Sequence, residues 1–187
     1  GDYRQLVKDV RVSFPGMVSA LFAIETAILD AFCREEEVPL SSLFGGRPAP
    51  VETDLTIPIL PADTAGERAD AATERGYNHL KIKTGGEVPT DIKRVEAIAE
   101  AAPEATLKID ANQGWTPKET VQFADTIASK GIELELIEQP VPASDITGLA
   151  KARDWVDVPI AADEAVFTPA DAVRIVRDVA ADVINVK

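Results

Sequence analysis

Two hydrophobic patterns alternate along the chain from residue 51 onward. Short, largely apolar runs are followed by longer segments in which apolar positions recur every three or four residues, and the unit repeats after about 25 residues. The short runs predict β-strands at residues 51–59, 78–83, 105–111, 133–140, 158–164 and 182–187. The longer segments predict α-helices at residues 61–76, 88–102, 116–131, 144–153 and 168–180.

This alternation predicts an α/β fold with a parallel sheet. Each helix returns the chain to the same edge of the sheet by a right-handed crossover, so consecutive strands run in the same direction. Two architectures have this order, a doubly wound open sheet and a (β/α)8 barrel. A nucleotide-binding doubly wound sheet is disfavoured, because no GxGxxG motif or other glycine-rich phosphate loop is present.

The first 47 residues follow a different pattern. Apolar positions recur at spacings of three and four between residues 17 and 32, which predicts a helix that ends near Val38. A short helical turn and a linker with glycine and proline follow. The sequence therefore divides into a helical part, residues 1–47, and an α/β part, residues 48–187.

Composition narrows the class of protein. With 45% hydrophobic and 27% charged residues, the chain resembles an ordinary globular sequence and not a disordered one. No run approaches the roughly 20 apolar residues of a membrane helix, and the first ten residues lack the layout of a signal peptide. The single cysteine, Cys33, excludes an internal disulfide and suits a reducing compartment, so we expect a cytoplasmic protein.

The charge of the chain restricts its partners. Acidic residues outnumber basic ones 32 to 19, which gives a net charge of −13. Such a surface repels phosphate backbones, so nucleic acid is not an expected partner. The acids are spread along the chain and not gathered in a tail, a pattern that is typical of proteins adapted to high salt.

Polar side chains stand at the carboxyl end of each predicted strand from the second to the sixth. In chain order they are Lys81 and Lys83, Asp110 and Asn112, Glu138, Asp163 and Glu164, and Lys187. From Lys83 onward a charged group recurs at intervals of 27, 28, 25 and 24 residues, once in each strand–helix unit. In a parallel barrel these strand ends lie on one face, which is where such barrels have their active sites.

Carboxylates gathered in one pocket repel one another unless a cation lies among them. Hard divalent ions such as Mg²⁺ take oxygen ligands, so acids from adjacent strands are suited to hold one metal ion. A lysine beside a metal ion and a second lysine should have a lowered pKa, which would make it a candidate base. His79, the only histidine, has no partner for a catalytic dyad and is expected at the surface or in packing.

The most distinctive residues fall in five short segments: KIKTGG, KIDANQGW, LIEQPV, IAADEAV and DVINVK. In order and spacing these segments resemble the barrel of the enolase superfamily, and within it the dipeptide epimerases of the muconate-lactonizing branch. The segment AIETAILDAFCREEEVPLSSLFGG resembles the helical part of the α+β capping domain of that family. The resemblance implies a (β/α)8 TIM barrel of which this sequence holds strands one to six, preceded by the helical part of a capping domain.

The resemblance also implies a metal site. It assigns one Mg²⁺, with Mn²⁺ as an alternative ion, to Asp110, Glu138 and Asp163. Asn112 and Glu164 match polar neighbours of these ligands. Where this chain has Ala165 the family often has serine, which removes one hydroxyl from the surroundings of the metal.

The same resemblance implies a reaction. Lys83 and Lys187 match two acid/base residues, and Lys81 matches a residue that assists electrostatically beside the metal. Such a site removes the proton next to a carboxylate and passes through an enolate. Two lysines on opposite faces of a planar intermediate favour return of the proton from the far side, which epimerises the carbon.

Substrate identity is less specific than the reaction class. The expected substrate is a small carboxylate, most simply a dipeptide, and a homo-oligomer is expected. Related cycloisomerases, o-succinylbenzoate synthases and N-acylamino-acid racemases share the lysine pair and remain alternatives. A metal-binding scaffold without catalysis is a second alternative, although it would have no need of lysines among the carboxylates.

Overall fold

The computed structural model describes residues 2–47 and 49–186. The chain forms two compact units, Gly1–Val51 and Glu52–Lys187. This boundary lies four residues after the one expected from the sequence, within the segment between α3 (Leu40–Leu43) and the first strand. In the described part of the chain, no helix combines the length and apolar character needed to cross a membrane.

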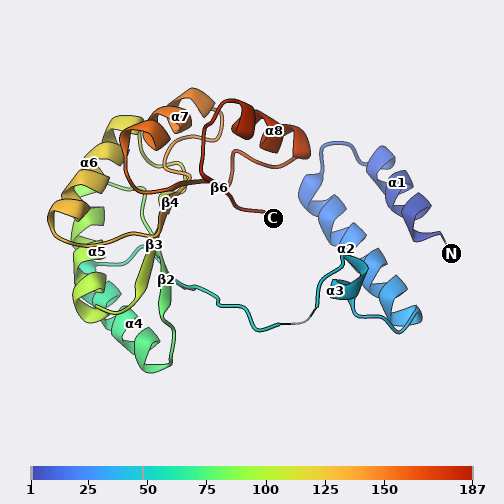
Figure 1. Ribbon diagram of the computed structural model, residues 1–187, viewed down its shortest axis with the longest axis horizontal. Helices are drawn as coiled ribbons and strands as arrows, with labels where there is room; N and C mark the ends of the chain where they lie inside the picture. Colours follow the sequence, from blue (N-terminus) through green and yellow to red (C-terminus); the bar gives the residue numbers. More distant parts are fainter. Residues whose placement is uncertain (1, 48, 187) are drawn as a thin grey trace. The chain divides into compact units, whose positions relative to one another are not determined.

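The second unit is built on one parallel sheet in which the strands follow chain order (Figure 1). Each strand pairs in parallel with its neighbour, as the alternation of strands and helices predicts. The strands are β1 (Leu55–Ile57), β2 (His79–Lys83), β3 (Thr106–Asp110), β4 (Leu136–Glu138), β5 (Ile160–Ala162) and β6 (Val183–Ile184).

Several strands are shorter than the apolar runs predict. Residues 51–59 contain only the three-residue β1, and β4 and β5 are likewise three residues long. Proline explains part of the difference, because it has no N–H to donate to a strand ladder. Pro58 directly follows β1, Pro140 follows β4 by two residues, and Pro159 directly precedes β5.

Helices follow one another around the outside of the sheet (Figure 1). They are α4 (Ala62–Glu74), α5 (Val88–Ala101), α6 (Pro117–Ser129), α7 (Ile146–Trp155) and α8 (Pro169–Arg177). The start of α6 is a capping box, in which Thr116 and Glu119 each bond the backbone N–H of the other. With this arrangement the sheet has the strand order and the outer helices of a (β/α)8 barrel.

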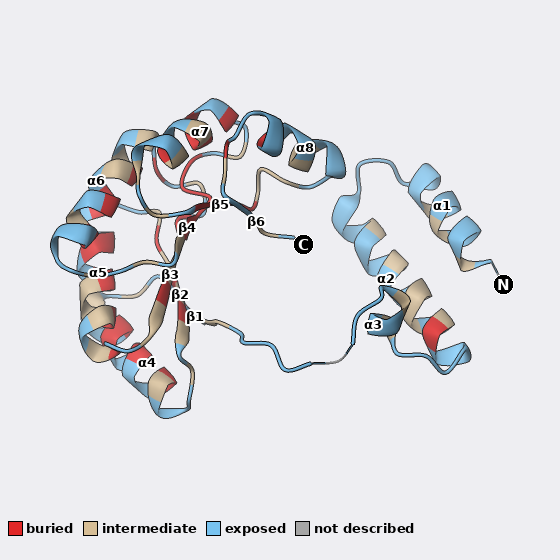
Figure 2. Ribbon diagram, viewed as in Figure 1, coloured by how far each residue is buried: buried red, intermediate tan, exposed pale blue. Residues whose placement is uncertain are grey.

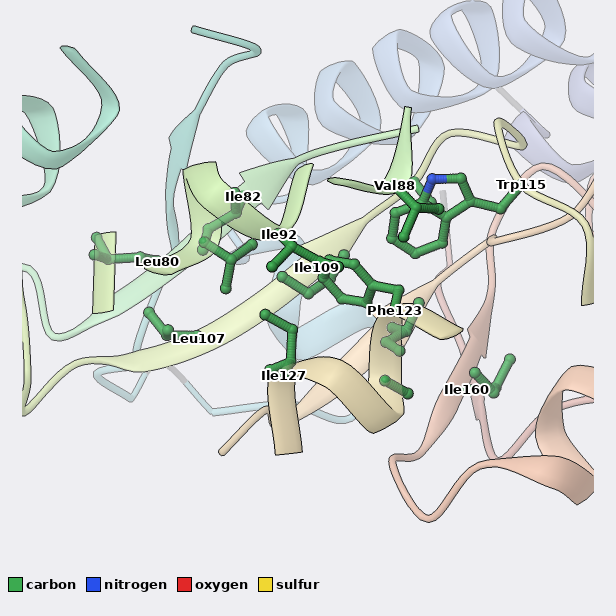
Figure 3. Packing of buried hydrophobic residues seen from close by; sticks show 14 of the residues in the cluster. Leu80, Ile82, Val88, Ile92, Leu107, Ile109, Trp115, Phe123, Ile127 and Ile160 are labelled. Atoms are coloured by element: carbon green, nitrogen blue, oxygen red, sulfur yellow. The ribbon is translucent and has the colours of Figure 1, made fainter. Parts of the chain in front are cut away.

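The hydrophobic core lies between the sheet and these helices, as Figure 2 shows by the buried positions on both. Side chains along β2 alternate between half-buried and buried, so Leu80 and Ile82 point toward the helices while the lysines lie on the other face. Ile109 of β3 and Phe123 of α6 join the same cluster (Figure 3). The core thus fixes the register that places the polar side chains together on the inner face.

The first unit is helical, and one of its helices was not predicted. It contains α1 (Tyr3–Ser13), α2 (Val18–Glu35) and α3 (Leu40–Leu43). The helix expected from residue 17 to near Val38 corresponds to α2, which ends at Glu35. The signal for α1 was present in the sequence, because Tyr3, Leu6, Val7 and Val10 recur at spacings of three and four. Asp2 caps this helix by accepting the N–H groups of Arg4 and Gln5.

A buried ion pair joins the loops that follow β1 and β2. One carboxylate oxygen of Asp91 accepts the N–H groups of Gly85 and Gly86, each at 2.9 Å, and the other binds the guanidinium of Arg94. Arg94 also donates to the carbonyl oxygen of Leu60 at 2.7 Å. Both charged side chains are almost fully buried, so removal of one leaves the other without compensation.

We predict that Asp91→Ala lowers the free energy of unfolding by about 3–5 kcal/mol, because it strands a buried guanidinium and two loop N–H groups. Urea denaturation measures this change. As a control, Lys130→Gln breaks the pair between Lys130 and Glu96, whose side chains are 38% and 32% exposed, and should change stability by less than about 1 kcal/mol. Equal small effects of both substitutions would contradict the prediction.

Candidate functional site

The candidate site lies at the carboxyl ends of the parallel strands. In the sheet register Lys83 pairs with Asp110, Asp110 with Glu138, and Glu138 with Ala161. Asp163 follows Ala161 by two residues and lies directly after the end of β5. The recurrence of charged residues along the sequence therefore corresponds to a row of neighbouring positions across four strands.

The lysines of β2 bind the carboxylates directly. The Lys81 Nζ atom lies 2.9 Å from Asp110 Oδ2 and 2.7 Å from Glu138 Oε2. The Lys83 Nζ atom lies 2.7 Å from the same Asp110 oxygen. Exposed fractions are 0% for Asp110 and 6% for both Glu138 and Asp163. Acids buried this deeply require compensating positive charge, and for Asp110 and Glu138 the lysines of β2 supply it.

These contacts change the pKa values of two groups. Burial lowers the pKa of Lys81, but hydrogen bonds and attraction from Asp110 and Glu138 outweigh burial, so the pKa is raised. Burial raises the pKa of Asp110, but Lys81 and Lys83 outweigh it, so that pKa is lowered. From the sequence a site lysine should have a lowered pKa. That expectation was for a lysine beside a bound metal ion and a second lysine, so it stays a prediction for the site with its metal.

Asn112 and Glu164 form a second connection across the site. Lys83 Nζ donates to Asn112 Oδ1 at 2.9 Å, and Asn112 Nδ2 donates to Glu164 Oε1 at 3.2 Å. The backbone N–H of Asn112 also bonds Asp110 Oδ1 at 3.0 Å.

 Within the second unit, Asn112 therefore connects the lysine at the end of β2 with the acid that follows β5.

Two site residues were not predicted from the sequence. Asn185, next to β6, donates from Nδ2 to Glu138 Oε1 at 2.8 Å. Gln139, directly after Glu138, is fully buried and bonds the backbone of the segment that follows β5. Both lie in segments already noted for their acids and lysines, LIEQPV and DVINVK. Their amide character was the available signal, because neutral amides at strand ends orient charged neighbours without adding charge.

The loops that carry the site have unusual backbone conformations. Asn112, Gln113 and Gln139 have positive φ angles of 43°, 68° and 37°. Non-glycine residues occupy this region rarely and often at functional sites. Gly85 and Gly114 allow the loops after β2 and β3 to touch, because a Cβ at either position would collide with backbone of the neighbouring loop.

The remaining predicted residues lie as follows. Asp163 is buried, and its backbone N–H bonds Gln139 Oε1 at 2.9 Å. Lys187 lies outside the described residues. His79 stands at the start of β2, away from the site, where its Nε2 atom lies 3.1 Å from Glu52 Oε2. That half-buried position agrees with the packing role expected for His79.

Among the described side chains, no three acids, histidines or cysteines are gathered closely enough to hold a metal ion as they stand. The ammonium group of Lys81 bridges Asp110 and Glu138 instead. The donor set is nevertheless of the right kind, since buried carboxylate oxygens on adjacent strands are the ligands that Mg²⁺ prefers. The chemistry of these residues therefore fits a divalent cation.

The chain belongs to the enolase C-terminal domain-like family, whose sequence profile matches residues 64–187. Together with the parallel sheet, this confirms a partial barrel of the enolase-superfamily type. The family explains why lysines and acids share one end of the sheet, since that end carries the active site in such barrels.

Known relatives agree with this assignment. An L-Ala-D/L-Glu epimerase of Clostridium acetobutylicum is 40% identical over 173 residues, which are 92% of this chain and 48% of the relative. The substrate-liganded L-Ala-D/L-Glu epimerase of Bacillus subtilis has a TM-score of 0.94 at 36% identity, covering 98% of this chain and 52% of that one.

A third relative was solved with ligands. The dipeptide epimerase of Enterococcus faecalis, in complex with Mg and the dipeptide L-Leu-L-Tyr, has a TM-score of 0.82 at 38% identity. The match covers 86% of this chain and 45% of that one. The present chain thus spans about half the length of the curated relatives it matches.

We predict that Asp110 makes the metal-free protein sensitive to acid. Its pKa is lowered in the folded state, so its contribution to stability is complete above the unfolded pKa of about 3.9 and is lost as pH falls through the folded value. The stability difference between wild type and Asp110→Asn should therefore narrow below about pH 4. Urea denaturation at a series of pH values measures it, and a difference that stays constant down to about pH 3 would contradict the prediction.

Proposed function

We propose that this chain carries the metal-binding and acid–base residues of a dipeptide epimerase. The reaction would be removal and return of the proton next to a carboxylate, through an enolate, with inversion of the carbon. The observation that carries the proposal is the direct contact of two lysines from one strand, Lys81 and Lys83, with candidate ligand carboxylates. The names of relatives at 37–40% identity support the dipeptide as substrate.

We assign the metal ligands to Asp110, Glu138 and Asp163, and the ion to Mg²⁺ with Mn²⁺ as a substitute. Carboxylate oxygens suit both ions. When bound, the ion supplies positive charge that stabilises an enolate next to a carboxylate. Lys81 contacts two of the three carboxylates, so it would add its own charge at the same place.

Lys83 and Lys187 would be the two acid/base residues. Lys83 is held by Asp110 and Asn112, which fixes its ammonium group at the end of β2. Lys187 follows β6 in the sequence. In an eight-stranded ring, the second and sixth strands are four positions apart and so lie across the barrel mouth. A substrate between them would present opposite faces of its α-carbon to the two lysines.

The role of the first unit and the adaptation to salt are also proposals. We propose that residues 1–47 belong to a capping domain, since the solved relatives match 98–99% of this chain and not the barrel alone. The negative charge of −13 supports adaptation to high salt. A cytoplasmic location and a homo-oligomeric state stay predictions from the sequence.

We predict that Glu138→Gln weakens Mg²⁺ binding by the intact protein at least about tenfold, because it removes one anionic ligand. Isothermal titration calorimetry measures the affinity. Glu135→Gln is the matched control, since Glu135 precedes the same strand at its other end, near Lys108. Unchanged Mg²⁺ affinity of the Glu138 variant would show that the metal site is assigned wrongly.

We predict that Lys83 and Lys187 each control exchange of the α-proton in one stereoisomer of the substrate. In D2O, Lys83→Ala should abolish deuterium incorporation from one epimer of a dipeptide and leave some from the other, while Lys187→Ala shows the reverse. Both should slow net epimerisation roughly 100-fold or more. NMR of the α-proton measures the exchange.

Exposed Lys93 of α5 gives the control variant, because Lys93→Ala should leave both exchange rates unchanged. Conversion of the substrate to a lactone, or loss of water, would instead indicate one of the related reactions. Net epimerisation by either active-site variant at nearly the wild-type rate would exclude the two-base mechanism.

A further inference from the structure

Gln139 is a fully buried glutamine that follows Glu138 at the end of β4. Its side-chain oxygen Oε1 accepts the backbone N–H of Asp163 at 2.9 Å and that of Ala165 at 3.1 Å. Its Nε2 atom donates to the carbonyl oxygen of Val141 at 2.9 Å. The amide group is therefore bonded at both ends to backbone of two different loops.

The main chain of Gln139 adds two further bonds. Its N–H donates to the carbonyl oxygen of Ala161 at 2.8 Å, and its carbonyl oxygen accepts the N–H of Gln113 at 2.8 Å. One residue thus connects the segments that follow β3, β4 and β5. These are the segments next to the three carboxylates of the proposed metal site.

Strand pairing alone does not position Asp163 relative to Glu138. The ladder between β4 and β5 pairs Ile137 with Ile160 and Glu138 with Ala161, and β5 ends at Ala162. Beyond that point the main chain of β4 turns away, with a positive φ of 37° at Gln139. A residue before proline seldom takes this conformation, so the surrounding hydrogen bonds must hold it there.

We propose that Gln139 is a positioning residue whose side-chain amide replaces the missing ladder step and fixes Asp163 next to Glu138. The amide presents the same acceptor and donor as a peptide group, and so extends the pairing of β4 with the segment after β5 by one step. The proposal rests on the proposed metal site, in which both carboxylates must reach one cation. Partners that orient metal ligands typically affect metal affinity about 10–100-fold.

The choice of glutamine follows from length and charge. A shorter asparagine would not span the distance between the two loops from the same backbone position. A glutamate would keep the acceptor but would place a carboxylate oxygen against the carbonyl oxygen of Val141. A methionine has similar length and no amide, so the N–H groups of Asp163 and Ala165 would lose their acceptor.

Calorimetric titration of the intact protein with Mg²⁺ tests the proposal. Gln139→Met should weaken Mg²⁺ binding at least about tenfold, and dipeptide α-proton exchange should recover when Mg²⁺ is raised to saturation. Gln139→Asn is the second test variant if Gln139→Met does not fold, because asparagine keeps a buried amide and tolerates a positive φ angle. It should also weaken Mg²⁺ binding.

Thr120→Val is the control, because Thr120 is also fully buried and its hydroxyl donates to the carbonyl oxygen of Thr116, the residue before α6. This variant loses a buried hydrogen bond away from the proposed ligands, so its Mg²⁺ affinity should equal that of wild type. Wild-type affinity in folded Gln139→Met and Gln139→Asn variants would overturn the proposal.

Failure of the proposed function would look different. Mg²⁺ would then bind in a manner that depends on Glu138 and Gln139, while wild-type protein would exchange no dipeptide α-proton. That result would support the positioning role and reject the epimerase.

Discussion

The burial of three carboxylates at the ends of adjacent strands is the constraint on which the rest of this site depends. Asp110, Glu138 and Asp163 are nearly inaccessible to solvent, and acids in such a place need positive charge close by. The lysines of β2 lie within hydrogen-bonding distance of two of them. The same need for positive charge makes the place suitable for a divalent cation, and it links the fold to the proposed chemistry.

The fold meets this constraint by separating two faces of one sheet. Apolar side chains such as Ile82 and Ile109 pack against the helices, and the polar side chains are thereby directed to the opposite face. The strands are short, so the loops complete the site. Strand pairing has ended in these loops, and other features hold them in place. These are the residues with positive φ angles, the close approach of glycines to neighbouring backbone, and the buried amide of Gln139.

The sequence predicted the features of the fold and the site that depend on a repeating pattern. The parallel order and the common location of Lys83, Asp110 and Glu138 follow from one charged residue in each strand–helix unit. The sequence did not predict the roles of Gln139 and Asn185, because those depend on loop conformations that have no repeating pattern. The lowered pKa expected of a lysine beside a bound metal ion stays a prediction.

The most direct test is anomalous diffraction from a crystal of the intact protein grown with Mn²⁺. We predict one strong anomalous peak from a single Mn²⁺ ion. Oxygen atoms of Asp110, Glu138 and Asp163 should coordinate this ion, and Lys81 should lie beside it. A peak at another place would contradict the central claim. So would a crystal with saturating Mn²⁺ in which no peak lies at these acids and Lys81 still bridges Asp110 and Glu138.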